Sequence, residues 1–145
     1  MSFINQQFAV FTINKSMYGL PIQEISEIIR MQTVNWTPNS QREVLGMIHL
    51  REKVIPIISL HRVFLETEKE LDSKTRIIVI HAKGKEIGIV VDEVDKVMLL
   101  PEQYISPPPY RSENGWMRGV YHHEELIIAL VHMEAVLGNV DMDLF

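Results

Sequence analysis

Short apolar runs rich in β-branched and aromatic residues recur along almost the whole chain, separated by brief polar breaks. Such runs are typical of β-strands, and breaks of two or three residues join neighbouring strands as antiparallel hairpins. The pattern is clearest at Leu45–Leu50 and Val54–Leu60, which flank the charged residues 51–53. These runs predict a hairpin that holds Arg51 at the rim of a β-sheet.

The same pattern predicts strands on both sides of this hairpin. Because Pro56 lies inside a predicted strand and has no N–H to donate, we expect it at a sheet edge or a bulge. The runs at 76–81 and 85–91 are apolar almost throughout, so both faces of these strands should be buried. The further predicted strands are Phe8–Ile13, Met17–Leu20, Val34–Pro38, Arg76–His81, Lys85–Val91, Asp92–Leu100 after an initial turn, Trp116–His122 and Leu126–Val131.

Helical spacing is confined to short segments. After Pro21, isoleucines at positions 22, 25, 28 and 29 predict either a two-turn amphipathic helix or a turn followed by a strand. Met133, Val136 and Leu137 predict a short C-terminal helix that stops at Gly138 in the left-handed conformation. Arg62–Leu65 is expected to form one helical turn, Glu66–Lys74 a charged surface loop, and Pro101–Arg111 an irregular or polyproline-like segment.

These elements predict an all-β protein of about ten short strands with two or three single-turn helices. Ten strands are too many for one small barrel, so we expect two barrels that share an interface. The length of 145 residues suits one compact unit or two very small ones. The sequence shows no convincing internal repeat.

Composition narrows the classes of function. A net charge of −5 without a basic run argues against a nucleic-acid partner. The chain has no cysteine, which excludes disulfides and thiolate chemistry and fits a cytoplasmic protein. No N-terminal signal pattern and no apolar run of membrane-spanning length are present, so we expect a cytoplasmic protein without direct membrane insertion.

Catalytic and metal-binding motifs are not found. The six histidines lack the HExxH spacing, and no GxSxG, P-loop or GxGxxG pattern occurs. Asp92, Glu93 and Asp95 form a tight acidic group, whose expected role is to keep a strand end soluble. We therefore expect a protein that binds partners and is not an enzyme, without cofactor or metal. The alternative from another class, a small β-barrel enzyme or ligand carrier, would need a closed polar pocket.

Three stretches, and a fitting C-terminal tail, resemble the CheW family, the coupling proteins of bacterial chemotaxis. Residues 8–30 share its strand, tyrosine-glycine turn and isoleucine-rich segment. Residues 45–60 are similar to its strand, Leu-Arg turn and proline-containing strand. Residues 86–109 are similar to its Val-Asp-x-Val run and proline-rich loop.

The resemblance implies one CheW-like domain over residues 1–145, made of two SH3-like five-stranded β-barrels packed on a shared hydrophobic core, with short helices. It also implies a non-catalytic adaptor that couples chemoreceptors to the regulatory domain of the histidine kinase CheA. The positions that match the family's receptor-binding residues are Ile25, Glu27, Gly46, Arg51, Val94 and Val97. Those implied to lie near the kinase contact are Arg76 and Ile77.

Three positions depart from the family pattern. Glu52 stands where the family prefers glycine, a residue suited to a positive φ. Ser59 and His61 replace an aspartate and an arginine, which would remove a rim salt bridge. Alternatives within the family are an adaptor of a non-chemotaxis receptor–kinase pathway such as surface motility, a CheV-type module, and an excised regulatory domain of the kinase.

Overall fold

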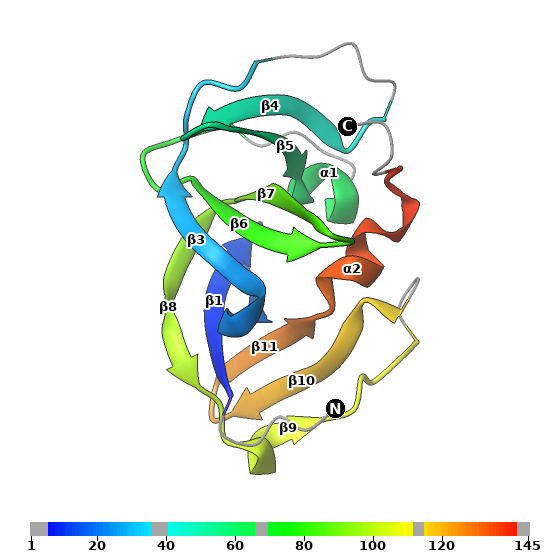
Figure 1. The fold of residues 1–145 in the computed structure, drawn as a ribbon. Coiled ribbons are helices and arrows are strands. Elements are labelled where there is room, and N and C mark those ends of the chain that lie inside the picture. The colour runs from blue at the N-terminus through cyan, green and yellow to red at the C-terminus, as the bar shows by residue number, and fades with distance from the viewer. Residues whose placement is uncertain (1–5, 36–40, 66–69, 112–114, 142–145) are drawn as a thin grey trace.

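The fold consists of β-strands with a few short helices, seen in a computed structural model that describes residues 6–35, 41–65, 70–111 and 115–141 (Figure 1). The strands are β1 (Gln7–Ile13), β2 (Ser16–Pro21), β3 (Ile25–Arg30), β4 (Val44–Leu50), β5 (Lys53–Ser59), β6 (Arg76–Ala82), β7 (Lys85–Val91), β8 (Glu93–Leu99), β9 (Ile105–Ser106), β10 (Met117–His123) and β11 (Leu126–Val131). The helices are α1 (Leu60–Leu65) and α2 (Met133–Val136), with 3₁₀ turns η1 (Ile22–Glu24), η2 (Glu102–Tyr104) and η4 (Leu137–Asn139).

The strands form two sheets, one above the other in Figure 1. The upper sheet has the order β3-β6-β7-β5-β4, and the lower sheet has the order β8-β1-β2-β11-β10-β9. The N-terminal hairpin β1–β2 therefore joins strands from residues 93–131, while hairpin β6–β7 completes the sheet of β3, β4 and β5. Each hairpin is joined by a parallel pair on one side, β2–β11 or β5–β7, and by an antiparallel pair on the other, β1–β8 or β3–β6. As a result, neither sheet is a continuous piece of the sequence.

The upper sheet closes on itself through the segment that follows β3. This segment returns to the opposite edge strand, β4, where Asn35 and Met47 exchange two backbone hydrogen bonds of 2.7 and 2.9 Å. The side chains enclosed by this sheet form one apolar cluster, whose buried members are Ile48, Ile55, Ile57, Ile77, Val79 and Val90. The lower sheet encloses a second cluster, whose buried members are Phe8, Val10, Leu100, Tyr121, Ile128 and Leu130.

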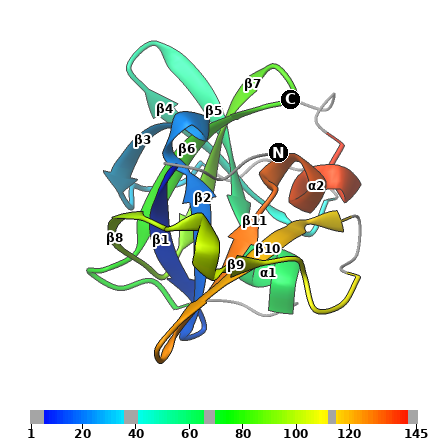
Figure 2. The same cartoon turned by 90° about the horizontal axis from the view of Figure 1, so that it is seen from below.

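A third and larger apolar cluster lies between the two sheets and receives side chains from both, as well as from α1 and α2. Its members include Phe11 of the lower sheet, Ile78 and Ile89 of the upper sheet, and Met133 of α2. Two barrels packed on a shared hydrophobic core, as the family resemblance implied, are therefore confirmed. The views from the front and from below place β3 and β8 on one side of this core, with the two helices on the other (Figures 1 and 2).

Several local predictions change. The isoleucine-rich segment forms the turn η1 followed by strand β3, which was the second of the two alternatives. The lower sheet has six strands instead of five, because β9 forms inside the segment expected to be irregular. Gly138 does not stop the C-terminal helix, since it lies within η4. In the predicted strand Val34–Pro38, only the bridge at Asn35 is seen, and residues 36–38 lie outside the described part.

Pro56 is not on an edge strand, because β5 pairs with β4 on one side and β7 on the other. The ladder between β5 and β7 begins only at Ile57, so Pro56 lies just outside it and its missing N–H is not needed for a hydrogen bond there. The expectation about Glu52 also changes. The positive φ of the β4–β5 turn, 58°, falls on Arg51 and not on Glu52, so this turn does not need the family's glycine at position 52.

The two barrels contain a matching hairpin, although the sequence shows no repeat. Strands β4 and β10 have the same alternation of buried and exposed residues, and each has a shift of register next to a glycine, Gly46 or Gly119. The turns that follow hold Arg51 and Glu124 at φ values of 58° and 57°. The two structural halves thus present different charges, Arg51 and Glu124, at equivalent turns.

Among the described residues, no helix has both the length and the apolar character that crossing a membrane requires.

Candidate functional site

Arg51 and Glu27, both assigned to the receptor surface by resemblance, are in direct contact. Arg51 Nη2 donates a hydrogen bond of 2.6 Å to Glu27 Oε2. This hydrogen bond and the charge of Glu27 hold the pKa of Arg51 above its ordinary value. Because Glu27 lies on edge strand β3 and Arg51 follows the opposite edge strand β4, the pair spans the seam of the upper barrel. The Arg51 side chain is 72% exposed, and a guanidinium has five N–H donors, so donors remain for a partner.

Gly46 is buried and is covered by the chain itself. A Cβ atom at this position would collide with the backbone oxygen of Asn35 and would lie 2.9 Å from Val34 Cγ1. Its φ of +149° also belongs to the region that favours glycine. The resemblance implied that Gly46 contacts the receptor, whereas its close neighbour in the structure is the segment that closes the upper barrel.

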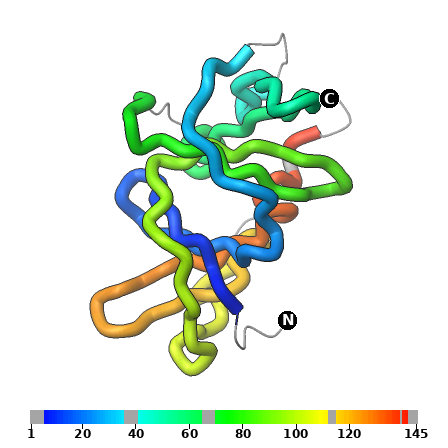
Figure 3. The backbone as a smooth tube through the Cα atoms, turned by 60° about the vertical axis from the view of Figure 1, so that its left-hand side comes forward, coloured from blue at the N-terminus to red at the C-terminus, as the bar shows by residue number. Residues whose placement is uncertain are grey.

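The apolar receptor positions lie on the two strands that flank the shared core. Ile25 of β3 and Val94 of β8 are half-buried and pack against that core, while Val97 of β8 is 50% exposed. Both strands are sheet edges and come forward in Figure 3. Two further exposed apolar residues belong to the same strands, Ile28 of β3 and Leu99 of β8. The period-2 spacing of Val97 and Leu99 on a strand could have identified Leu99 from the sequence.

The two residues expected near the kinase contact have different environments. Arg76 begins β6 and is half-buried at the surface, where it lines a pocket together with Arg30, Met31, Asp72, Ser73 and Thr75. Ile77 is fully buried inside the upper barrel. A contact by Arg76 is therefore possible in this conformation, while Ile77 supports the strand from inside.

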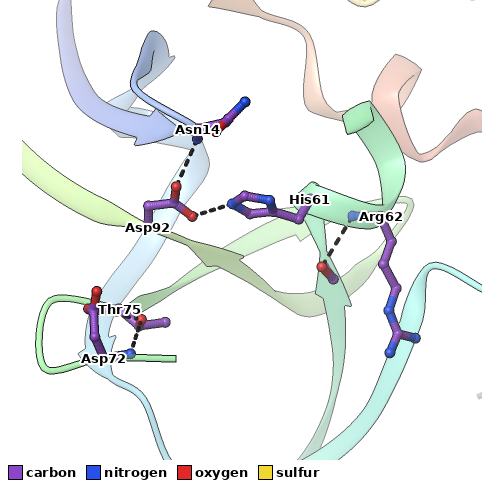
Figure 4. Close-up of polar contacts among 7 residues, drawn as sticks. Asn14, His61, Arg62, Asp72, Thr75 and Asp92 are labelled. Atoms are coloured by element: carbon purple, nitrogen blue, oxygen red, sulfur yellow. Dashed lines mark hydrogen bonds and ion pairs between the residues drawn. The ribbon is translucent and has the colours of Figure 1, made fainter. Parts of the chain in front are cut away.

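A buried polar contact connects the two barrels where the sequence pattern indicated a lost salt bridge. His61 of α1 lies 2.5 Å from Asp92 through its Nε2 and the carboxylate Oδ1, and Asn14 N donates to Asp92 Oδ2 at 2.8 Å (Figure 4). Asp92 N also donates to Thr12 O. The loss of the family's rim salt bridge through Ser59 and His61 stays a prediction, but His61 has a carboxylate partner of its own in Asp92. Asp92 holds the start of β8 against α1 and the β1–β2 turn and is not a solvated strand-end charge.

The histidines have separate, structural contacts. His81 Nε2 lies 2.6 Å from Ser26 Oγ, His132 Nδ1 lies 3.2 Å from Arg118 Nη2, and His123 stacks on Tyr104. Within the described residues, no three histidine or acidic side chains are grouped so that they could hold a metal ion. What the structure does present is a paired charge at a barrel seam and exposed apolar side chains on two edge strands. This arrangement is that of a protein-binding scaffold built from two β-barrels.

Comparison with known proteins gives the family of this scaffold. The family model described as the CheW-like domain matches residues 7–141. Because this match covers almost the whole chain, the protein belongs to the CheW-like domain family, whose members are non-catalytic scaffolds.

Individual relatives agree with this assignment. The chemotaxis protein CheW of Klebsiella aerogenes is 29% identical over 144 residues, with 97% of this chain and 87% of that protein covered. Protein FrzA of Myxococcus xanthus is 26% identical, with 72% and 65% covered. The crystal structure of the scaffolding protein TtCheW from Thermoanaerobacter tengcongensis superposes with a TM-score of 0.84 at 25% identity, covering 92% of this chain and 93% of that one.

Proposed function

We propose that this chain couples the cytoplasmic tips of chemoreceptors to the histidine kinase CheA in bacterial chemotaxis arrays, and that it does so in the cytoplasm. The observation that carries the proposal is the match of nearly the whole chain, in sequence and in fold, to CheW scaffold proteins. No catalytic step is assigned to the protein. Its contribution is to hold two partners in a fixed relation.

The receptor surface of this proposal consists of Ile25, Glu27, Arg51, Val94 and Val97, with Gly46 supporting the seam beneath Arg51. A receptor tip is a helical hairpin, and an amphipathic helix binds by laying apolar side chains on an apolar surface. Half-buried and exposed apolar residues of β3 and β8 provide such a surface. The remaining donors of Arg51 can form a charge-assisted hydrogen bond with an acidic residue of that helix.

The kinase surface of this proposal lies around Arg76 at the start of β6, where Ile77 anchors the strand from the barrel interior. This region belongs to the upper barrel, and none of the six receptor positions lines the pocket beside Arg76. Two separate surfaces allow one adaptor to hold both partners at once. A change in the receptor can then bias the equilibrium of the kinase, provided that the contacts differ between the receptor states.

Reconstitution tests this function. Receptor tip fragments, the full-length kinase and this chain are sedimented together, and kinase activity in the pellet is measured. We expect the wild-type chain to carry kinase into the pellet and to make its activity depend on the receptor. Arg51→Ala and Val97→Glu should weaken the binding of receptor tips while the protein stays folded.

Lys53→Ala is the matched control, because Lys53 directly follows the same turn and pairs with a glutamate, Glu86, at 2.8 Å. If Arg51→Ala and Val97→Glu bound receptor tips as well as the wild-type chain does, the receptor surface would be wrong. If the wild-type chain recruited no kinase, the proposed function itself would fail.

A second candidate is an adaptor of the same kind in a receptor–kinase pathway other than chemotaxis, such as one for surface motility. The match to FrzA favours it, because FrzA is a family relative that is not named a chemotaxis protein. Deletion of the gene separates the two candidates. Loss of swimming chemotaxis with normal surface movement supports the first, and the reverse phenotype supports the second.

A further inference from the structure

Two arginines face each other on neighbouring strands at one end of the upper barrel. Arg30, the last residue of β3, is the direct partner of Arg76, the first residue of β6, in the antiparallel ladder. Side chains at directly opposite positions lie on the same face of a sheet with their Cβ atoms about 5 Å apart, and like charges there are destabilising. No hydrogen bond or ion pair joins the Arg30 side chain to any residue in the described part of the chain. The repulsion between the two guanidiniums is therefore not relieved through Arg30.

Arg76 is held in place by backbone carbonyls. Its Nη1 donates to Ser73 O at 2.9 Å and to Thr75 O at 3.0 Å, which accounts for both N–H groups of that nitrogen. The donors on Nε and Nη2 remain, and such a planar pair of donors matches the two oxygens of a carboxylate. Because the carbonyls fix the guanidinium before any partner arrives, little conformational entropy is lost when an anion binds.

The surroundings of the pair form a small open site. A surface pocket of about 440 Å³ is lined by both arginines, Met31, Asp72, Ser73 and Thr75. Asp72 is used within the loop, since its Oδ1 accepts from Lys74 N, Thr75 N and Thr75 Oγ1. Among the described residues that line this pocket, two arginines and Asp72 leave one positive charge, on a chain whose net charge is −5.

We propose that Arg30 and Arg76 together bind an acidic side chain of the kinase CheA, with the fixed Arg76 as the bidentate donor and Arg30 as the second cation. This inference rests on the proposed function and adds to it the chemistry of the kinase contact and a residue, Arg30, that no sequence pattern indicated. The pocket contains none of the six receptor positions. An acidic residue seated between the guanidiniums relieves their repulsion and gives binding a charge-specific component.

Binding of the full-length kinase to the full chain tests the inference, with receptor-tip binding measured in parallel. Arg30→Glu and Arg76→Glu are each expected to weaken kinase affinity by about tenfold or more, because each leaves an acidic group of the partner without its cation. Receptor-tip binding should be unchanged. Lys74→Glu is the matched control, since it makes the same change of charge in the adjoining loop but does not line the pocket, and it should weaken kinase binding by less than about threefold.

A second measurement does not depend on the partner. Arg30→Glu should raise the melting temperature of the free protein, because an opposite-charge pair replaces a like-charge pair in the ladder. Three results would each overturn the inference. They are a wild-type kinase affinity in Arg30→Glu, an equal loss of kinase affinity in Lys74→Glu, and a loss of receptor-tip binding without a loss of kinase binding. If the wild-type chain bound no kinase, the proposed function would fail as well. If the wild-type chain bound kinase but Arg30→Glu bound it equally well, only this inference would fail.

Discussion

Arg51 and Glu27 form one ion pair of 2.6 Å across the seam of the upper barrel, and this pair ties the β4–β5 turn to β3. The two residues are 24 positions apart in the sequence and belong to opposite edge strands. The guanidinium of Arg51 is therefore already oriented by a carboxylate, and we propose that a receptor recognises the pair as one unit.

If the pair is the unit, removing Glu27 should weaken receptor binding even though Arg51 remains. In Glu27→Ala the Arg51 side chain loses its fixed orientation and must be ordered when the receptor binds. Because the Arg51 side chain is 72% exposed and its ion pair is screened by water, the unfolding transition should move little. Co-sedimentation with receptor tips measures the effect. Glu86→Ala is the control, as it releases Lys53 in the same way, and receptor binding equal to wild type in Glu27→Ala would contradict this prediction.

Gly46→Ala should destabilise the protein by about 2 kcal/mol or more, because the new Cβ meets the backbone of Asn35 at the bridge that closes the barrel. Chemical denaturation measures the free energy of unfolding. Gly84→Ala separates this clash from the backbone effect. Gly84 also has a positive φ, 76°, but nothing lies within 4 Å of its added Cβ. If both variants lost the same free energy of unfolding, the close approach of Asn35 would not be the cause of the destabilisation in Gly46→Ala.

Asp92→Ala should lower the free energy of unfolding by about 2 kcal/mol, because it leaves His61 and Asn14 N without their acceptor in a part-buried site. Receptor binding should also weaken, since Asp92 positions the start of β8. Glu93→Ala removes a neighbouring carboxylate that lies outside this contact and should leave stability nearly unchanged. A stable Asp92→Ala variant with normal receptor binding would show that the contact between the barrels has neither role.

The carboxylate of Glu86 should titrate below its ordinary pKa of 4.5, because its hydrogen bond from Lys53 favours the charged form. The contribution of this pair to stability is thus present above the ordinary pKa and is lost as the pH falls through the lowered one. Carboxyl-carbon NMR of the wild-type chain and Lys53→Ala measures the shift. The pKa should rise toward its ordinary value in the variant, and an unchanged pKa would exclude Lys53 as the cause.

The alternation of apolar and polar residues predicted most of the hairpins, because strand pairing across a short turn depends on neighbouring residues only. It also placed Arg51 at a sheet rim and β8 after a turn. It did not assign Asp92 to a buried contact, because its partner His61 comes from a distant segment. It did not assign Arg30 to a site, because its ladder partner Arg76 also comes from a distant segment. A charged residue beside a strand has the same sequence signature whether it is solvated or paired.

The sequence by itself determined that this is a β-rich protein of short hairpins, since strand periodicity and turn chemistry are local properties. Only the tertiary structure decided which hairpin completes which barrel, because the parallel pairs β2–β11 and β5–β7 join segments far apart in the chain. It also decided what Gly46 and Arg51 face. Gly46 lies under the segment that closes the barrel, and Arg51 meets Glu27 only because the upper sheet curls until its two edges are close.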